Sequence, residues 1–128
     1  MSQRILTNNR PEYIQALRSL QPTHVIAPYG FEWRGLNNIK IITNKHDYRR
    51  LKLANTTWDV RQNNKVHAKL IIGKNGVLLG SWNFTPTSTN NKHEIAIVIY
   101  GTDTKEYADC LTYFNSLWRC SHDKEIHA

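Results

Sequence analysis

The sequence contains few cysteines and no long apolar run, and each absence excludes a class of protein. Its two cysteines among 128 residues, Cys110 and Cys120, fall in one predicted helix. Ten residues at about 1.5 Å each separate them by roughly 15 Å, which is too far for a disulfide bond. No run of 18 apolar residues predicts a membrane span, and the first residues lack the apolar stretch of a secretory signal. We therefore expect a soluble, cytoplasmic protein with reduced cysteines and no membrane partner.

Acidic residues are also scarce relative to basic ones. Ten Asp and Glu residues against 17 Lys and Arg residues give a formal net charge of +7. This balance favours a polyanionic partner, and nucleic acid ranks ahead of anionic lipid because no amphipathic membrane helix stands out. A basic soluble protein without such a partner is the alternative interpretation.

The metal-ligand patterns in the sequence are incomplete. The segment "HEIAI" begins like a zinc-protease motif but has Ile97 where the second histidine is required. Cys120, His122 and His127 lack a fourth ligand at regular spacing. We therefore expect no metal ion and no cofactor.

Helical and strand patterns alternate along the chain, in which 40% of the residues are hydrophobic. Apolar residues at helical spacing predict helices at 11–20 and after a capping box of Asp103 and Glu106. A basic stripe at helical spacing predicts a third helix at 44–54. The predicted strands are 23–27, 39–43, 57–61, 66–72, 77–80 and 94–100. This order predicts one α/β domain over residues 1–128, with a mixed β-sheet flanked by helices on both faces.

The turn-rich segment "YGFEWRG" follows the first predicted strand and contains three aromatic residues, Tyr29, Phe31 and Trp33. Two roles are open for their side chains, stacking on unpaired bases and packing the loop itself. We favour packing.

Residues 65–85, "KVHAKLIIGKNGVLLGSWNFT", are typical of a β-hairpin with polar residues at both ends. Side chains alternate across a strand, so His67 and Lys69 project to the same face. Ser81 and Asn83 have the same spacing on the second strand. Whether the four side chains meet depends on the turn, because a shift of one residue in the pairing register moves a strand's side chains to the other face.

Two turns are compatible with the glycine of this hairpin. A two-residue turn at 75–76 pairs Lys69 with Trp82 and puts the serine on the opposite face. A three-residue turn at 74–76, with the glycine in the left-handed position of a bulge, pairs Lys69 with Ser81. Since only this second register gathers the four polar side chains, we predict the three-residue turn.

Such a cluster suits the cleavage of a phosphodiester. A histidine near its ordinary pKa of about 6.5 is largely neutral at pH 7 and serves as nucleophile or base. Lysine supplies a positive charge, and serine and asparagine donate hydrogen bonds to the non-bridging oxygens, which stabilises charge on five-coordinate phosphorus. No metal ion is required when these groups do that work.

The same residues resemble a known signature. "HAK", followed after ten residues by "GSWN", resembles the His-x-Lys and Gly-Ser-x-Asn motifs of the phospholipase D superfamily, specifically of its short, single-motif nucleases. "NFT" with "NNKHEIAIVI" resembles the segment that ends in a glutamate before the last strand there. The likeness covers roughly residues 23–100.

This resemblance implies roles for five residues. His67 attacks phosphorus to form a phosphohistidine, and a second copy of His67 protonates the leaving oxygen. Lys69, Ser81 and Asn83 bind the phosphate, and Glu94 orients the histidine ring. Since two histidines are needed and one motif is present, the resemblance implies a homodimer with a shared site.

The sequence departs from the family pattern at one position. Members usually carry an aspartate seven residues after the histidine, where this chain has Lys74. We interpret the change as a trimmed turn, and a non-catalytic member of the family is the alternative.

Basic residues near the motif form a further candidate binding set. Lys45, Arg49 and Lys52 recur at i, i+4 and i+7 on one predicted helix, and Arg61 and Lys65 follow. These residues are either a solvated face or the wall of a groove that contacts phosphates beside the cut. We favour the groove and predict that all five bind substrate.

The sequence therefore predicts a metal-independent phosphodiesterase or endonuclease that cleaves nucleic acid, with DNA favoured over RNA. One alternative is an inactive member that binds nucleic acid. A less favoured alternative is a phospholipid hydrolase, because no surface for acyl chains is evident in the sequence.

Overall fold

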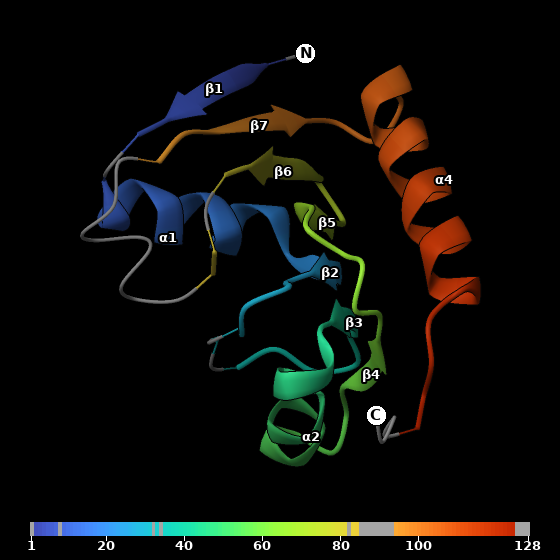
Figure 1. Cartoon of the computed structure of the whole chain (residues 1–128). Coiled ribbons are helices and arrows are strands. Elements are labelled where there is room, and N and C mark those ends of the chain that lie inside the picture. Colours follow the sequence, from blue (N-terminus) through green and yellow to red (C-terminus); the bar gives the residue numbers. More distant parts are fainter. Residues whose placement is uncertain are drawn as a thin grey trace.

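The computed structural model describes residues 2–7, 9–31, 33, 35–81, 83–84 and 94–124. Within these ranges the chain forms a mixed, seven-stranded sheet in the order β1-β7-β6-β5-β2-β3-β4 (Figure 1). Its strands are β1 (Gln3–Leu6), β2 (Pro22–Ile26), β3 (Lys40–Thr43), β4 (Asp59–Gln62), β5 (Lys69–Gly73), β6 (Gly76–Gly80) and β7 (Ala96–Tyr100). The helices are α1 (Arg10–Leu20), α2 (Lys45–Ala54) and α4 (Lys105–Arg119).

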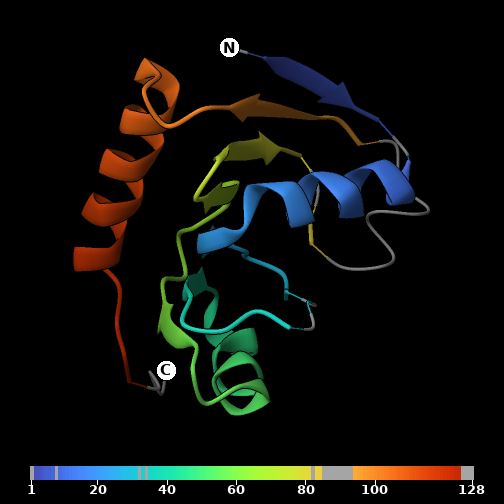
Figure 2. The same cartoon turned by 180° about the vertical axis from the view of Figure 1, so that it is seen from behind.

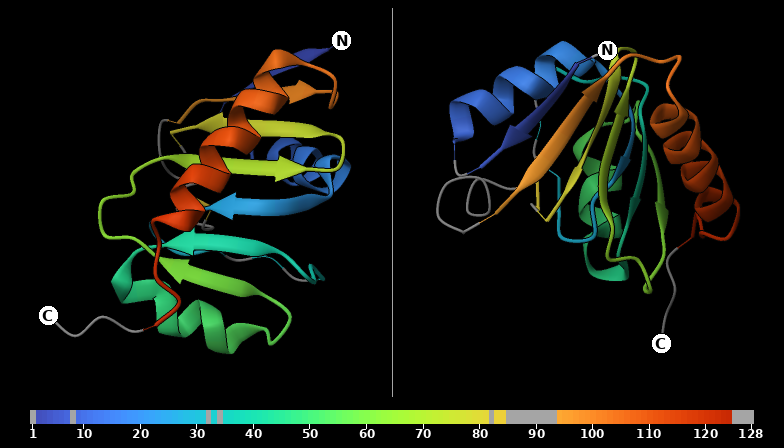
Figure 3. Two further views of the ribbon diagram at one scale, coloured as in Figure 1. Left: turned by 90° about the vertical axis from the view of Figure 1, so that its right-hand side faces the viewer. Right: turned by 90° about the horizontal axis from the view of Figure 1, so that it is seen from above.

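Helices cover both faces of this sheet, which confirms the predicted fold class (Figures 2 and 3). One hydrophobic cluster joins α1 and α2 to the sheet and includes Ile71 and Leu78. A second cluster joins α4 to the other face through Phe114 and includes Leu70 and Ile72. The alternation of Leu70, Ile71 and Ile72 between the two clusters is the period of two that a strand covered on both faces requires.

The sequence patterns did not predict β1. It pairs antiparallel with β7, and of its four residues only Leu6 is buried, whereas Ile5 is 58% exposed. So short a segment carries no periodicity of its own. Its strand conformation comes from the hydrogen bonds that the neighbouring strand offers.

The hairpin of β5 and β6 has a different register from the predicted one, so the three-residue turn is wrong. Gly73 pairs with Gly76, and Lys69 pairs with Gly80. The turn is therefore the two residues 74–75, which ends one residue earlier than either alternative. Lys69 consequently does not pair with Ser81.

This register is set by the end of α1. The backbone N–H of Lys74 donates to the Gln21 carbonyl at 3.1 Å, and that of Asn75 donates to the Leu20 carbonyl at 3.2 Å. A Cβ on Gly73 would lie 2.1 Å from the Leu20 oxygen, so only glycine fits there. The turn thus satisfies carbonyl groups that α1 leaves without a helical partner, and this long-range contact has no local sequence signal.

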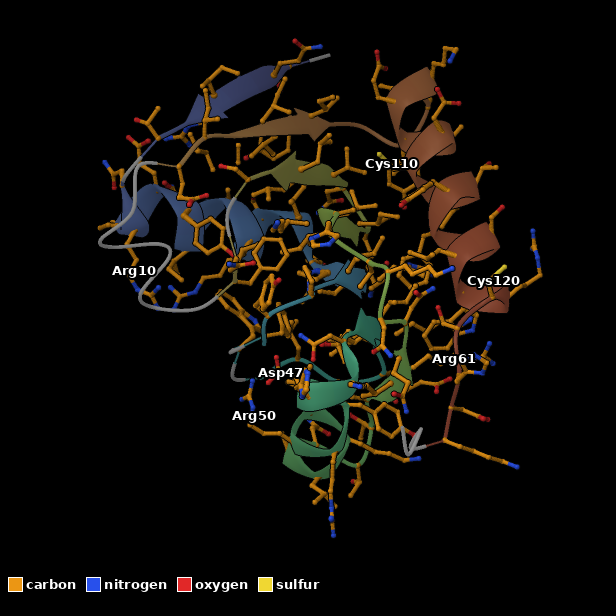
Figure 4. All side chains as sticks on the ribbon, in the orientation of Figure 1. Arg10, Asp47, Arg50, Arg61, Cys110 and Cys120 are labelled. Atoms are coloured by element: carbon orange, nitrogen blue, oxygen red, sulfur yellow. The ribbon has the colours of Figure 1, made fainter. Side chains whose placement is uncertain are left out.

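The N-cap of the last helix lies one residue later than predicted. The N-cap is Thr104, whose hydroxyl accepts a hydrogen bond from the Tyr107 N–H at 3.0 Å, so the predicted capping role of Asp103 is wrong. Cys110 and Cys120 are both free and lie apart along this helix (Figure 4). Burial raises the pKa of the Cys110 thiol. In the described ranges, none of the helices has the length and apolarity needed to cross a membrane.

His24 in β2 makes the stability of the fold depend on pH. Its ring meets that of Phe114 edge-on at 4.9 Å, and its Nδ1 shares a hydrogen bond of 2.8 Å with the Thr23 hydroxyl. Burial beneath α4, with Lys40 nearby, holds the pKa of His24 below its ordinary value of 6.5. The unfolded chain therefore binds this proton more readily, and we expect the free energy of unfolding to fall as the pH drops below about 6.5.

Urea unfolding between pH 5 and pH 8 measures this dependence. We expect His24→Gln to have a shallower slope of stability against pH than the wild type over this range. His46→Gln, a change at an exposed histidine of α2, serves as the control and should keep the wild-type slope. Equal slopes in His24→Gln and the wild type would contradict the assignment.

Candidate active site

The predicted catalytic positions lie at one edge of the sheet. β5 runs antiparallel to β2 and β6, and β7 runs antiparallel to β6. The start of β5, the end of β6 and the start of β7 therefore share an edge, at the left of the left panel of Figure 3. His67 and Lys69 lie at the start of β5, Ser81 and Asn83 follow β6, and Glu94 precedes β7. The topology thus brings these five residues, which are separated by up to 27 positions, to the same edge.

His67 lies outside the strand ladder and is exposed. The residue before it, Val66, is buried, and its N–H donates to the Asn63 carbonyl. His67 lines a pocket of about 230 Å³ together with Tyr29, Lys45 and other residues of the neighbouring loops. The backbone before His67 is therefore anchored, and the exposed imidazole is open to a ligand.

Lys69 and Ser81 are positioned by the ladder between β5, β6 and β7. Lys69 opens β5 on the face of Ile71, which is the face that α1 and α2 cover. Ser81 lies one residue beyond β6, where its N–H donates to the Ile95 carbonyl at 3.0 Å and its Oγ accepts from the Ile95 N–H at 3.1 Å. The serine hydroxyl is thereby held at the backbone of Ile95, the residue after Glu94.

Gly80, the glycine of the Gly-Ser-x-Asn motif, has a packing role that sequence reasoning missed. A Cβ at this position would lie 2.4 Å from the Ile95 oxygen and 2.6 Å from the Ala96 Cα. Only glycine lets β6 approach β7 this closely. The signal was present in the motif, but its reason is visible only in the pairing of the two strands.

Asn83 and Glu94 are partly buried at this edge, and the Asn83 Oδ1 and Glu94 Oε2 atoms are shielded from solvent. Phe84, the next residue, forms a β-bridge with Phe31, and the centres of the two rings lie 6.1 Å apart. This pairing places Asn83 near the residues that follow β2. Trp82 and His93 lie outside the described residues.

The basic residues of α2 have two different environments. Lys45, in the first turn, lines the pocket beside His67. Lys52, about two turns away, donates to the Tyr48 hydroxyl at 2.9 Å and to the Asp123 carbonyl at 3.4 Å, and the bond to Tyr48 raises its pKa. Arg49 lies exposed between them. Lys65 is exposed in the loop that leads to His67. Lys45 and Lys65 therefore lie nearest the edge, and Lys52 lies far from it.

Arg61 in β4 points to the opposite face of the sheet. Its Nη1 donates to the Trp118 carbonyl at 2.8 Å, and its guanidinium lies 4.2 Å from the centre of the Trp118 ring. Figure 4 shows it beside the C-terminal end of α4. The structure therefore does not bring Arg61 together with the basic residues of α2, and its contacts hold α4 to the sheet.

Arg61→Ala is expected to lower the free energy of unfolding by about 1–3 kcal/mol, because it removes a cation–π contact and a charged hydrogen bond. Chemical denaturation measures the loss. Arg50→Ala is the matched control, since Arg50 is an exposed residue whose ion pair with Asp47, at 3.5 Å, should change stability little when it is lost. Wild-type stability in Arg61→Ala together with weaker nucleic-acid binding would support the groove role instead.

Clustered metal ligands are absent from the part of the chain that the structure describes: no three His, Cys, Asp or Glu residues there lie close enough to hold an ion. Cys120 and His122 belong to that part, and His127 lies outside it. The pocket beside His67 also includes His46 and Asn64, which no sequence pattern pointed out.

A family model described as "Cardiolipin synthase, PLD-like domain" matches residues 4–118 of the chain. No curated protein matches the chain at a significant level.

Several solved structures are similar to this one. Nuc from Salmonella typhimurium, described as a phospholipase D family member, has a TM-score of 0.71 and 20% identity, over 98% of this chain and 100% of that one. NucT from Helicobacter pylori has a TM-score of 0.66 and 18% identity, over 94% and 98%. TrmBL2, described as an archaeal chromatin protein with a novel mode of DNA binding, has a TM-score of 0.62 and 14% identity, over 97% of this chain and 54% of that one. These similarities show the shared fold.

Proposed function

Because the chain belongs to the phospholipase D superfamily, we propose that it is a single-domain, metal-independent phosphodiesterase that cleaves nucleic acid, with DNA preferred over RNA. The observation that most supports this function is the strand order, which puts the positions of His67, Lys69, Ser81, Asn83 and Glu94 at the same edge of the sheet. These residues supply a nucleophile, a cation, two neutral donors and a carboxylate, which together make up the chemistry that a phosphodiester requires.

The reaction proceeds in two displacements at phosphorus. The neutral imidazole of His67 attacks the phosphorus, a nitrogen–phosphorus bond forms, and the bond to the leaving strand's oxygen breaks. The partner's His67, in its protonated form, donates a proton to that oxygen. Water then attacks the phosphohistidine and loses its proton to the same partner histidine, which frees His67 and releases the second strand end as a phosphate monoester.

The other residues stabilise charge and orientation in both steps. The ammonium of Lys69 and the amide of Asn83 contact the non-bridging oxygens. The Ser81 hydroxyl accepts its hydrogen bond from the Ile95 N–H, so its own proton is able to turn to a phosphate oxygen from its 3.3 Å contact with the Ile95 carbonyl. The Glu94 carboxylate accepts the second ring N–H of the histidine and fixes its tautomer.

A second copy of the chain completes the site in this proposal. Three large apolar side chains are exposed on the α4 side of the sheet near the catalytic edge: Leu79 is 37% exposed, Ile95 is 55% exposed and Tyr113 is 50% exposed. We refer to these three as the apolar edge surface. Leu79 and Tyr113 line an apolar groove of about 420 Å³ on that side. An exposed apolar surface that adjoins a site with one histidine supports a homodimer with a shared centre.

Two observations support nucleic acid as the substrate. The net charge of +7 favours a polyanion, and Lys45 and Lys65 flank His67 at the catalytic edge. Among the similar structures, TrmBL2 is described as binding DNA. DNA is therefore the first substrate to test.

The test is incubation of purified protein with labelled single- and double-stranded DNA and RNA in excess EDTA. The His67→Ala variant is assayed in parallel. Cleavage by the wild type in EDTA, with none by the variant, supports the proposal. Loss of cleavage on chelation would contradict metal independence. Turnover of cardiolipin vesicles without cleavage of DNA would identify a phospholipid hydrolase, and binding of DNA without cleavage would identify an inactive member.

A further inference from the structure

The pocket beside His67 contains an exposed aromatic ring. The Tyr29 side chain, in the turn after β2, is 52% exposed and lines the pocket with Lys45, His46 and Asn64. None of the described residues that line this pocket is acidic. Phe31, two residues further on, is 2% exposed and packs on Phe84 and Trp58. The expected packing role of this loop therefore holds for Phe31, whereas Tyr29 is left open to a ligand.

The walls of the pocket are held in place by hydrogen bonds between three separate loops. The side-chain amide of Asn44, after β3, donates to the Pro28 carbonyl, next to Tyr29. The backbone N–H of Lys45 donates to Asn64 Oδ1, after β4, at 3.2 Å. Each loop that contributes to the pocket is thus tied to another. A site with preformed walls loses little conformational entropy when a ligand enters.

We propose that this pocket binds one unpaired nucleobase, stacked on the ring of Tyr29, from the nucleotide next to the phosphate that His67 attacks. The inference rests on the proposed function. Because His67 is itself part of the pocket wall, a base seated there belongs to a nucleotide that adjoins the scissile bond. Lys45 then neutralises the flanking phosphate, and His46 and Asn64 face the edge of the base.

This assignment restricts the substrate to nucleic acid with unpaired bases. A base inside a duplex is stacked between its neighbours and paired, so its faces are not available to Tyr29 unless the strand is opened. Stacking of a base on an aromatic side chain contributes about 1–3 kcal/mol and depends little on which base is present. The enzyme therefore cleaves single strands in preference to duplexes, without marked sequence specificity.

The experiment compares two labelled single-stranded oligodeoxynucleotides, one with normal bases and one with the same backbone but abasic residues at its centre. Tyr29→Ala is expected to lower kcat/KM on the normal strand by about 5- to 150-fold, which is 1–3 kcal/mol of lost stacking. Tyr29→Phe, which keeps the ring, is expected to recover most of this loss. On the abasic segment, wild type and Tyr29→Ala should cleave at the same rate, because no base is present to stack.

The outcomes separate this inference from the function on which it rests. If the wild type cleaves none of these strands, the proposed function fails. If cleavage depends on His67 but Tyr29→Ala cleaves the normal strand as fast as the wild type does, only the base-binding assignment is overturned. The same holds if Tyr29→Ala loses as much activity on the abasic segment as on the normal strand. A wild type that cleaves duplex DNA as fast as the normal strand overturns it too. Circular dichroism of Tyr29→Ala verifies that the substitution, at a half-exposed residue, leaves the fold intact.

Discussion

Replacing His67 by alanine is expected to abolish cleavage, with a fall in the single-turnover rate of about 10⁴-fold or more. The variant loses the nucleophile and, in a homodimer, also the proton donor that the second copy supplies. The fold should survive, because His67 is exposed and lies outside the ladder that begins at Lys69. The rate is measured on labelled single-stranded DNA in excess EDTA, and thermal unfolding verifies that the variant is folded.

A covalent intermediate gives this prediction a second readout. Acid-labile attachment of labelled DNA to the protein is expected in the wild type during a single turnover and should be absent from His67→Ala. His122→Ala, which removes another exposed histidine, is the control and should behave as the wild type does. Residual cleavage above about a hundredth of the wild-type rate in His67→Ala would mean that another group attacks phosphorus.

Tyr113→Asp is expected to separate the dimer and to lower cleavage by about a hundredfold or more, although the residue makes no proposed contact with substrate. Tyr113 is half-exposed on α4 and belongs to the apolar edge surface, so a carboxylate there would be desolvated against apolar side chains of the second copy. A monomer contains one His67 and lacks the proton donor. Sedimentation velocity gives the oligomeric state, and the same cleavage assay gives the rate.

Leu53→Asp is the matched control, because Leu53 is 73% exposed on α2 and lies outside the apolar edge surface. It should remain dimeric and active. If Tyr113→Asp remains dimeric, Leu79→Asp tests the same groove from β6. A monomer that retains full activity would contradict the shared site.

Mixing subunits tests the shared site without disturbing the surface. When wild type and His67→Ala are mixed equally and allowed to exchange, only about a quarter of the dimers contain two intact histidines. Activity should therefore fall to about a quarter of that of the same total amount of wild type. Independent sites in each subunit would retain about half.

Much of the fold was predictable because its signals are local. Apolar spacing located α1 and α4, the spacing of basic residues located α2, and the dense apolar runs located β5 and β7, with boundaries within a few residues. The motif residues from His67 to Glu94 were identified by their types and spacing. The antiparallel order of β5, β6 and β7 brings these positions to one edge, although the predicted pairing of Lys69 with Ser81 was wrong.

The remaining features depend on contacts between distant parts of the chain. The hairpin turns at 74–75 because its amides satisfy the carbonyls of Gln21 and Leu20 at the end of α1, some 50 residues earlier. No pattern within the hairpin itself favours this turn over a turn that is shifted by one residue. Similarly, β1 forms because β7 offers it a partner.

Side-chain roles divide in the same way. The sequence shows that Arg61 and Lys45 are basic, but it does not show that Arg61 packs on Trp118 while Lys45 lies beside His67. Tyr29 and Phe31 belong to one short loop, and only one of them is buried. Residue chemistry and spacing are local properties that any stretch of the chain displays, whereas the direction of a side chain depends on which surface the folded sheet and helices place against it. The family was therefore evident from the residue types and spacing of the chain alone. The pocket beside His67 was not, because its walls come from the loops after three different strands, which only the folded sheet brings together.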